Sequence, residues 1–164
     1  YGAVRSVRCV SEVEAEDLIP DLQVVSSKLK GILVSETRVP FAIDEFPVVF
    51  IAASCAEGET ILPGAKELRV KESDRMQVMA DGLTSLGIEN HVLEDGIRIL
   101  GGEFTKQASS IKSHHDHRIS MAFAIASVRS KFDIEMEGVD NVKNSFPNFE
   151  VLANSIGMRM QPYS

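Results

Sequence analysis

The segment FPVVFIAASCA, residues 46–56, is apolar on nearly every side of the helix that it predicts. A second segment, ISMAFAIASV at residues 119–128, has the same character. A helix that is apolar all round is buried on every side, whereas a surface helix carries only an apolar stripe. We therefore expect these two helices at the centre of the domain, which is an uncommon arrangement in a protein that also contains strands.

The elements around these two segments alternate between strands and helices, which is typical of an α/β domain. Helices are predicted over residues 45–56, 74–86, 118–129 and 146–155. Strands are predicted over residues 3–10, 21–25, 59–62, 90–93, 97–100, 132–137 and 159–161. Asp95-Gly96 predicts a two-residue turn between two of these strands.

Between two apolar regions lies the charged heptapeptide RVKESDR, residues 69–75. Ser73 is a favourable N-cap for the helix that follows. The free amides and the dipole at a helix start attract anions, and Lys71 and Arg75 strengthen that field. Glu72 lies within it as a candidate proton carrier. The pattern indicates a site for a phosphorylated or carboxylated substrate, although a solvated loop of mixed charge would have the same composition.

A second polar cluster, His114-His115-Asp116-His117-Arg118, leads directly into the second apolar segment. Buried polar groups cost free energy unless they find partners, so a cluster at the start of a buried helix more often serves a ligand. The presence of two such clusters favours a ligand site over a solvated loop.

The chain has 164 residues, enough for one domain with its own core. Its net charge of −7 argues against partners that are nucleic acids or anionic membranes, because neither would be attracted. No apolar run reaches the roughly 18 residues of a membrane span. Cys9 and Cys55 lack CxxC spacing, so we expect no disulfide and a reducing compartment, the cytoplasm. The first residue is Tyr1 rather than Met, so we expect a fragment of a longer protein.

The chain resembles itself at a shift of 72 residues. Four identities follow this register, namely Asp44 with Asp116, Val70 with Val142, Lys71 with Lys143 and Ser73 with Ser145. In each copy an Asp opens an apolar helix, a strand follows, and a Lys-x-Ser loop leads into a second helix. The shared order of elements favours a duplication over a chance match.

Four motifs of this chain resemble the C-terminal motifs of the 5-enolpyruvylshikimate-3-phosphate synthase family, in the same order. They are IDEFP at residues 43–47, RVKESDR at 69–75, DHR at 116–118 and SFP at 145–147. The likeness covers essentially the whole chain. DEFP and LRVKES, at residues 44–47 and 68–73, are closer to the glyphosate-insensitive branch of that family.

The resemblance implies a fold of two domains, each built from three repeated β/α units with helices inside and sheets outside, an inside-out α/β barrel. This agrees with the two central helices expected above. Residues 1–164 would then form a single partial domain and a little less than half of the enzyme.

The resemblance also implies transfer of the enolpyruvyl group of phosphoenolpyruvate to the 5-hydroxyl of shikimate 3-phosphate, with release of phosphate. This is a step of the shikimate pathway to the aromatic amino acids, and it needs no cofactor. The expected partners are these two small molecules, in a monomer whose site is completed by the other domain. We therefore expect the chain alone to be inactive.

Two acids correspond to the carboxylates of the family's reaction. Asp44 matches the aspartate at the shikimate hydroxyl, which we interpret as the base; from its position alone, an N-cap of the following helix is the better interpretation. Glu72 matches the residue that shuttles a proton to and from the phosphoenolpyruvate carbon. Its alternative role is a salt bridge to Arg69, Lys71 or Arg75.

The cationic residues are matched to residues of the family in the same way as the two acids. Arg75 and Arg118 match arginines that bind phosphoenolpyruvate, since guanidinium forks suit phosphate and carboxylate oxygens. Arg118 would otherwise pair with Asp116. Lys71 matches a lysine near the shikimate hydroxyl. His117 belongs to its motif either as a hydrogen-bonded structural residue or as a catalytic one.

Two positions depart from the family pattern. Asn144 stands where many members have a lysine directly before SFP, which leaves Lys143, one place earlier, as a doubtful ligand. Glu67 stands where some members have an asparagine that contacts the shikimate ring. His114 and His115 have no counterpart in the motifs, and we expect no metal site.

Two other functions stay open. The sister transferase that moves enolpyruvate onto UDP-N-acetylglucosamine shares the fold but lacks the combination of RVKESDR and DHR. A non-catalytic anion-binding module would keep the fold and usually lose one acid, whereas this chain retains both Asp44 and Glu72.

Overall fold

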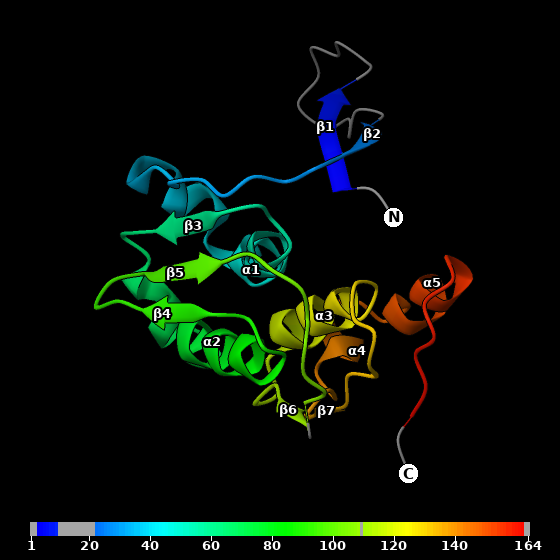
Figure 1. The fold of residues 1–164 in the computed structure, drawn as a ribbon. Helices are drawn as coiled ribbons and strands as arrows, with labels where there is room; N and C mark the ends of the chain where they lie inside the picture. Colours follow the sequence, from blue (N-terminus) through cyan, green and yellow to red (C-terminus); the bar gives the residue numbers. More distant parts are fainter. Residues whose placement is uncertain (1–2, 10–21, 109, 163–164) are drawn as a thin grey trace, which may run out of the picture.

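The computed structural model describes residues 3–9, 22–108 and 110–162, with side chains from residue 27 onward. The helices are α1 (Phe46–Ser54), α2 (Arg75–Ser85), α3 (His117–Ala126), α4 (Val142–Ser145) and α5 (Phe149–Ser155), with the 3₁₀-helices η1 (Glu36–Glu45) and η2 (Lys66–Val70). The strands are β1 (Ala3–Cys9), β2 (Leu22–Ser27), β3 (Glu59–Leu62), β4 (Asn90–Val92), β5 (Ile97–Leu100), β6 (Ile111–Lys112) and β7 (Met136–Glu137). Helices and strands mix along the chain, as predicted (Figure 1).

The three-stranded sheet has the antiparallel order β3-β5-β4, and α1 and α2 pack against it (Figure 1). Strand β5 buries Ile97 and Ile99 and exposes Arg98 and Leu100. On the exposed side, Arg98 donates two hydrogen bonds of 2.9 Å to the carboxylate of Glu59 across the sheet. The sheet is therefore an outer layer with the helices inside it, which is the arrangement expected from the sequence.

The core lies where α1, α2 and α3 meet under this sheet, and α1 packs along α3. Its large members include Phe46, Phe50, Met76, Met79, Leu83, Leu86, Ile119 and Phe123. These residues are spaced by three or four along each helix, so each helix turns one apolar side to the others.

The two helices expected to be buried on all sides are buried on most of them. Val48 on α1 is 41% exposed, and Ile125 on α3 is 38% exposed. Val128, directly after α3, is 53% exposed. The prediction of burial all round is thus wrong at these positions, where nothing in the described part of the chain covers the apolar side chains.

The helix starts differ from the predicted caps. Asp74, not Ser73, is the N-cap of α2, and its Oδ1 accepts the backbone N–H of Gln77 at 3.0 Å. Asp116 caps α3, as expected for an Asp that opens an apolar helix. Asp44 does not cap α1, because η1 already includes it and the chain is helical there rather than extended as at an N-cap.

The turn between β4 and β5 is centred one residue earlier than predicted. Leu93 N–H donates to Gly96 O at 2.8 Å, which places Glu94 and Asp95 at the centre of the turn. A Cβ on Gly96 would lie 2.0 Å from the carbonyl oxygen of Leu62. Glycine is needed at position 96 for close backbone approach rather than for the turn itself.

The C-terminal third departs most from prediction. The strand predicted over residues 132–137 is limited to β7, which pairs in parallel with β6, and no strand forms over 159–161. The helix predicted over residues 146–155 begins at Phe149 as α5, and the unpredicted short helix α4 ends just before it, because Pro147 disfavours helical backbone at Phe146 and the backbone there is not helical. A strand of two residues is too short to show the alternation of apolar and polar side chains from which strands are predicted.

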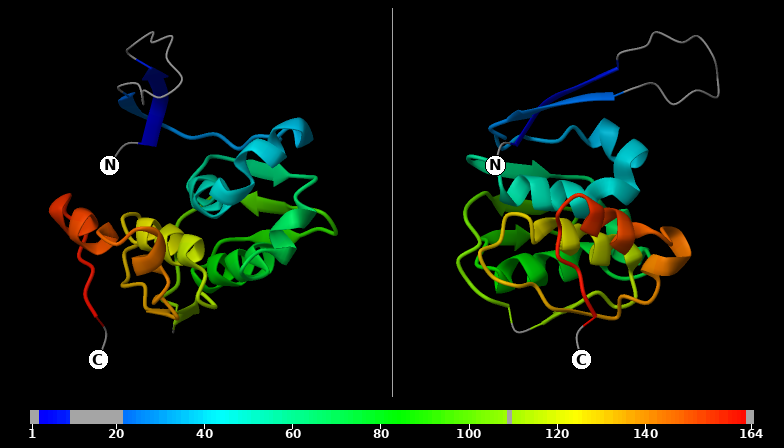
Figure 2. Two further views of the ribbon diagram at one scale, coloured as in Figure 1. Left: turned by 180° about the vertical axis from the view of Figure 1, so that it is seen from behind. Right: turned by 90° about the vertical axis from the view of Figure 1, so that its right-hand side faces the viewer.

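Strands β1 and β2 form an antiparallel hairpin that stands apart from the rest of the domain (Figures 1 and 2). No other described strand pairs with it, and the predicted strand ends at residues 10 and 21 lie outside the described residues. Among the described residues, no helix has the length and apolar content needed to cross a bilayer.

The contact between α2 and α3 gives a first prediction. A Cβ on Gly82 would lie 2.2 Å from Cζ of Phe123. The roughly 1 kcal/mol by which helices favour alanine over glycine is outweighed by overpacking, which costs about 1–3 kcal/mol. We expect Gly82→Ala to lower the free energy of unfolding in urea by about 1–2 kcal/mol.

Gly102→Ala is the matched control, because its Cβ would meet only Ile88 Cδ1 at 3.9 Å. That variant should stay within about 0.5 kcal/mol of the parent. A Gly82→Ala protein as stable as the control would contradict the close packing of α2 on α3.

Candidate active site

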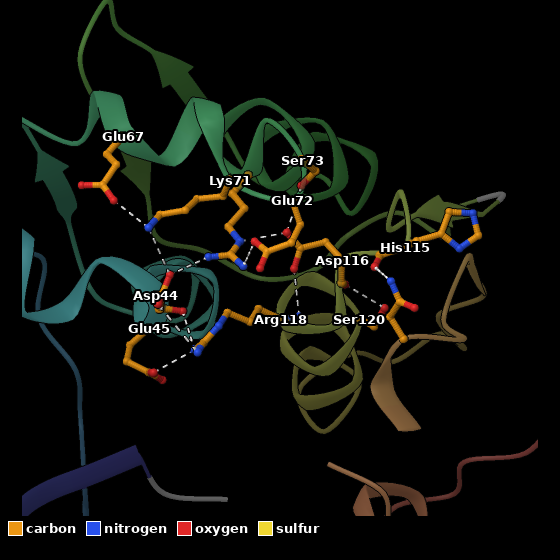
Figure 3. A network of polar contacts seen from close by, with 12 residues as sticks. Asp44, Glu45, Glu67, Lys71, Glu72, Ser73, His115, Asp116, Arg118 and Ser120 are labelled. Carbon is orange, nitrogen blue, oxygen red and sulfur yellow. Dashed lines mark hydrogen bonds and ion pairs between the residues drawn. The ribbon is translucent and has the colours of Figure 1, made fainter. Parts of the chain in front are cut away.

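Charged side chains from three separate chain segments meet where α1, α2 and α3 begin (Figure 3). These side chains come from the end of η1, from η2 and the loop that leads into α2, and from the first turns of α2 and α3. We call this group the central cluster, and it consists of Asp44, Glu45, Glu67, Lys71, Glu72, Ser73, Arg75, Asp116 and Arg118.

Arg75 lies in the middle of the central cluster, and its side chain is only 1% exposed. Its Nε donates to Asp116 Oδ2 at 2.8 Å, its Nη1 to Asp44 Oδ1 at 2.9 Å, and its Nη2 to Glu72 Oε2. Burial opposes the charge, but the hydrogen bond and charge of Asp116, with those of Asp44 and Glu72, raise the pKa of Arg75 above its ordinary value. A buried cation is tolerated only when it is paired, and here each guanidinium nitrogen has its own carboxylate.

Asp116 is fully buried and connects two of the helix starts. Its Oδ2 accepts from Arg75 and also from Ser73 Oγ at 3.1 Å. Its Oδ1 accepts the backbone N–H of Arg118 at 3.0 Å, which caps α3. The ion pair suggested between the side chains of Asp116 and Arg118 is therefore not the one that forms, because Asp116 is directed toward Arg75.

The side chain of Arg118 instead reaches across to the end of η1. Its Nη1 donates to Asp44 O at 2.9 Å and to Glu45 Oε1 at 2.8 Å. Its Nη2 lies 3.9 Å from Asp44 Oδ2. These contacts join the start of α3 to the start of α1, so residues 74 positions apart become neighbours.

Lys71 approaches the same aspartate from the other side (Figure 3). Its Nζ lies 3.6 Å from Asp44 Oδ1 and 2.6 Å from Glu67 Oε1. The hydrogen bond that Lys71 donates to Glu67 is the main reason that the pKa of Lys71 is raised, and the charge of Asp44 adds to it. Arg69, the third cation of the heptapeptide, points elsewhere, donating to Asp74 Oδ2 at 3.2 Å and to Leu93 O at 2.9 Å.

Asp44 thus faces three cations. Burial disfavours its charged form, but the hydrogen bond from Arg75 and the charges of Lys71 and Arg118 outweigh that effect. Together they hold the pKa of Asp44 below its ordinary value of 3.8. The carboxylate is therefore ionised at neutral pH and available as an acceptor.

Two predicted residues lie outside the central cluster. His117 is the half-buried first residue of α3, and Lys143 is exposed on α4.

Before α3, His114 and His115 have a left-handed backbone conformation, with φ of 53° and 60°. Residues other than glycine rarely adopt this conformation. Asn141 Nδ2 donates to His115 O at 2.7 Å and ties this turn to the start of α4. Within the described ranges, no three His, Cys, Asp or Glu residues are grouped so that they could hold a metal ion.

The structure brings together Asp44, Lys71, Glu72, Arg75 and Arg118, as the sequence predicted, and adds members that sequence reasoning did not place there. The motifs include Asp116 and Glu45, but the sequence assigns neither of them as a partner of the other charged residues in this cluster, apart from the alternative pairing of Asp116 with Arg118. One signal existed for Asp116, since it occupies the register position of Asp44 at the shift of 72 residues. For Glu45, no sequence pattern distinguishes it from an ordinary solvated glutamate.

An α/β domain with inner helices, an outer sheet and a charged cluster at the helix starts defines the enolpyruvyl transferase class of fold. A solved structure of EPSP synthase from Acinetobacter baumannii superposes with a TM-score of 0.84 and 47% sequence identity, over 97% of this chain. The family described as EPSP synthase (3-phosphoshikimate 1-carboxyvinyltransferase) matches residues 7–152, and the chain belongs to that family.

Individual relatives agree with this assignment. The chain is 66% identical over 144 residues to the 3-phosphoshikimate 1-carboxyvinyltransferase of Vesicomyosocius okutanii, covering 88% of this chain and 33% of the relative. It is 63% identical over 159 residues to the protein of the same name from Ruthia magnifica, covering 97% and 36%. The chain thus spans about a third of the length of the curated relatives that it matches.

The pKa of Asp44 gives a prediction for acid stability. Because this pKa is lower in the folded protein, the stability that Asp44 contributes is present above 3.8 and is lost as pH falls through the lower folded value. We expect the Tm of the parent to fall more steeply below about pH 4 than the Tm of Asp44→Asn, which has no carboxylate to protonate. Equal slopes in the two proteins would contradict the stabilisation of ionised Asp44 by its three cations.

Proposed function

We propose that this chain is part of an enzyme that transfers the enolpyruvyl group of phosphoenolpyruvate to the 5-hydroxyl of shikimate 3-phosphate and releases phosphate. The observation that carries the proposal is the meeting of Asp44, Glu72, Arg75 and Arg118 at three neighbouring helix starts. The names of the relatives support this choice of substrates.

In the addition step, Asp44 is the base that takes the proton of the 5-hydroxyl while the oxygen bonds to C2 of phosphoenolpyruvate. Its carboxylate is ionised at neutral pH, so it can accept that proton. The ammonium of Lys71, 3.6 Å from Asp44, would stabilise the negative charge that develops on the hydroxyl oxygen.

Glu72 is the second proton carrier of this mechanism. It protonates C3 of phosphoenolpyruvate during addition, which turns the methylene into a methyl group. In the elimination step it takes a proton back from that methyl group, while the C2–O bond to phosphate breaks. Its side chain is 52% exposed at the edge of the central cluster, where a substrate can reach it.

Arg75 and Arg118 are the ligands that we assign to the phosphate and carboxylate of phosphoenolpyruvate. Each charge-assisted hydrogen bond from a guanidinium contributes about 1.5–3 kcal/mol. His117 and Lys143 stay as candidate substrate contacts of lower rank, since both lie outside the hydrogen-bonded cluster.

We also propose that residues 1–164 form one partial domain built from two copies related by the shift of 72 residues. Helices α1 and α3 correspond under this shift, pack on one another and begin at the same cluster, which supports the duplication. The exposed apolar side chains of Val48 on α1 and Ile125 on α3 support a further part of the longer protein covering these helices. The complete enzyme would be a cytoplasmic monomer.

The acceptor distinguishes this proposal from the two other functions. A transferase for UDP-N-acetylglucosamine would release phosphate from phosphoenolpyruvate only with that acceptor. A non-catalytic module would bind phosphate and release none. Steady-state assays of the full-length protein with both acceptors therefore separate all three.

The role of Glu72 gives a prediction for the full-length protein. General acid–base groups contribute about 10²–10⁴-fold to turnover, so Glu72→Gln should lower kcat by that factor with Tm preserved. Glu59→Gln, which neutralises a glutamate paired with Arg98 on the outer side of the sheet, should leave kcat unchanged. A Glu72→Gln enzyme within about threefold of the parent rate would remove Glu72 from the mechanism.

The partial domain gives a prediction for the isolated chain. Because half of the substrate contacts belong to the rest of the longer protein, titration calorimetry should detect binding of shikimate 3-phosphate only to the full-length protein. Micromolar binding by residues 1–164 alone would mean that the site does not span two domains.

A further inference from the structure

Each cation of the central cluster is held by an exposed glutamate. Arg118 pairs with Glu45 at 2.8 Å, Lys71 pairs with Glu67 at 2.6 Å, and Arg75 pairs with Glu72. The side chains of these glutamates are 64%, 58% and 52% exposed, whereas the cations are 30%, 21% and 1% exposed. The glutamates therefore stand between solvent and the cations.

The remaining acids of the cluster are held differently. Asp116 is fully buried and is fixed by Arg75, Ser73 and the backbone of Arg118. Asp44 faces three cations at once. Among the described residues, Glu45 and Glu67 each have one cationic partner. Releasing an exposed single pair costs little, because such pairs contribute only about as much as thermal energy.

An incoming anion needs the same nitrogens. Arg75 in particular is too buried to meet a substrate unless a covering carboxylate moves, and Glu72 is the most exposed of its three partners. A phosphate group brings more negative charge and more acceptor oxygens than one carboxylate, so it can replace these glutamates.

We propose that Glu45, Glu67 and Glu72 are displaceable counter-ions, which neutralise Arg118, Lys71 and Arg75 in the empty site and leave when a doubly charged anion binds. The inference rests on the proposed function for the identity of the substrate anions. It adds that the affinity of the site is set by competition with the protein's own carboxylates. Singly charged anions gain too little to displace them, so the glutamates contribute to selectivity for phosphorylated compounds.

Glu45 and Glu67 allow a test apart from catalysis, because neither has a role in the proposed proton transfers. In the full-length protein, Glu45→Gln and Glu67→Gln should each tighten the Kd for phosphoenolpyruvate and for inorganic phosphate by about 1.5- to 5-fold. The affinity for chloride, measured by competition, should rise by a larger factor than the affinity for phosphate.

Two controls isolate direct competition from a general change in charge. Glu103→Gln removes an exposed glutamate paired with Lys131 at 3.1 Å outside the cluster, and it should leave both Kd values unchanged. In an Arg118→Ala background, Glu45→Gln should no longer tighten phosphate binding, since its competitor for that cation is gone. Tightening that persists in this background would assign the effect to long-range charge and overturn the proposal.

Other results of the binding and transfer measurements would also overturn one of the two proposals. Unchanged or weaker binding by Glu45→Gln and Glu67→Gln would mean that these residues orient the cations, and the proposal would be wrong. A full-length protein that binds no inorganic phosphate in any variant would also overturn it. If the variants bind phosphate more tightly but the full-length protein transfers no enolpyruvyl group, the proposed function is wrong and the counter-ion proposal stands. If the protein transfers the group but the variants bind phosphate no more tightly, the counter-ion proposal is wrong and the proposed function stands.

Discussion

The arrangement of this domain depends on one buried guanidinium. Arg75, at the first position of α2, is almost inaccessible to solvent, and its three nitrogens bind carboxylates from η1, from the preceding loop and from the start of α3. Removing a charge from water costs several kcal/mol, and the pairs with buried Asp116 and with Asp44 offset that cost. The three helix starts must therefore meet at this point for the chain to fold as it does.

The same constraint creates the properties that the proposed reaction needs. A cation that holds the carboxylate of Asp44 in its ionised form makes an acceptor at neutral pH. The fixed pairing with Asp116 keeps the guanidinium oriented while its outer nitrogens face the exposed side of the cluster. In the proposed mechanism, structural pairing and substrate recognition would use different edges of one side chain, which would separate the permanent counter-ion from the exchangeable ones.

The periodicity of apolar residues predicted the bounds of an element well where that element is long or lies between clear turns. Strands β3 and β5 have the predicted bounds, α2 lies within its predicted helix, and α3 begins one residue before its predicted start at residue 118. It failed for α4, β6 and β7, because elements of two to four residues are too short for a period to appear. At Ser73 and Asp74 two good capping residues are adjacent, and local preference does not decide between them; the hydrogen bond from Ser73 to Asp116 does.

The sequence by itself determined the α/β class of fold and the two inner helices, because apolar periodicity is a local property of a chain, and the resemblance of its motifs to a known family indicated the five charged residues that meet in the central cluster. Only the tertiary structure decided which charge pairs with which. Asp116 binds Arg75 rather than the side chain of Arg118, and Glu45 enters the cluster from η1. These pairings depend on burial and on the distances between helices, and neither quantity is encoded in the order of residues within any one segment.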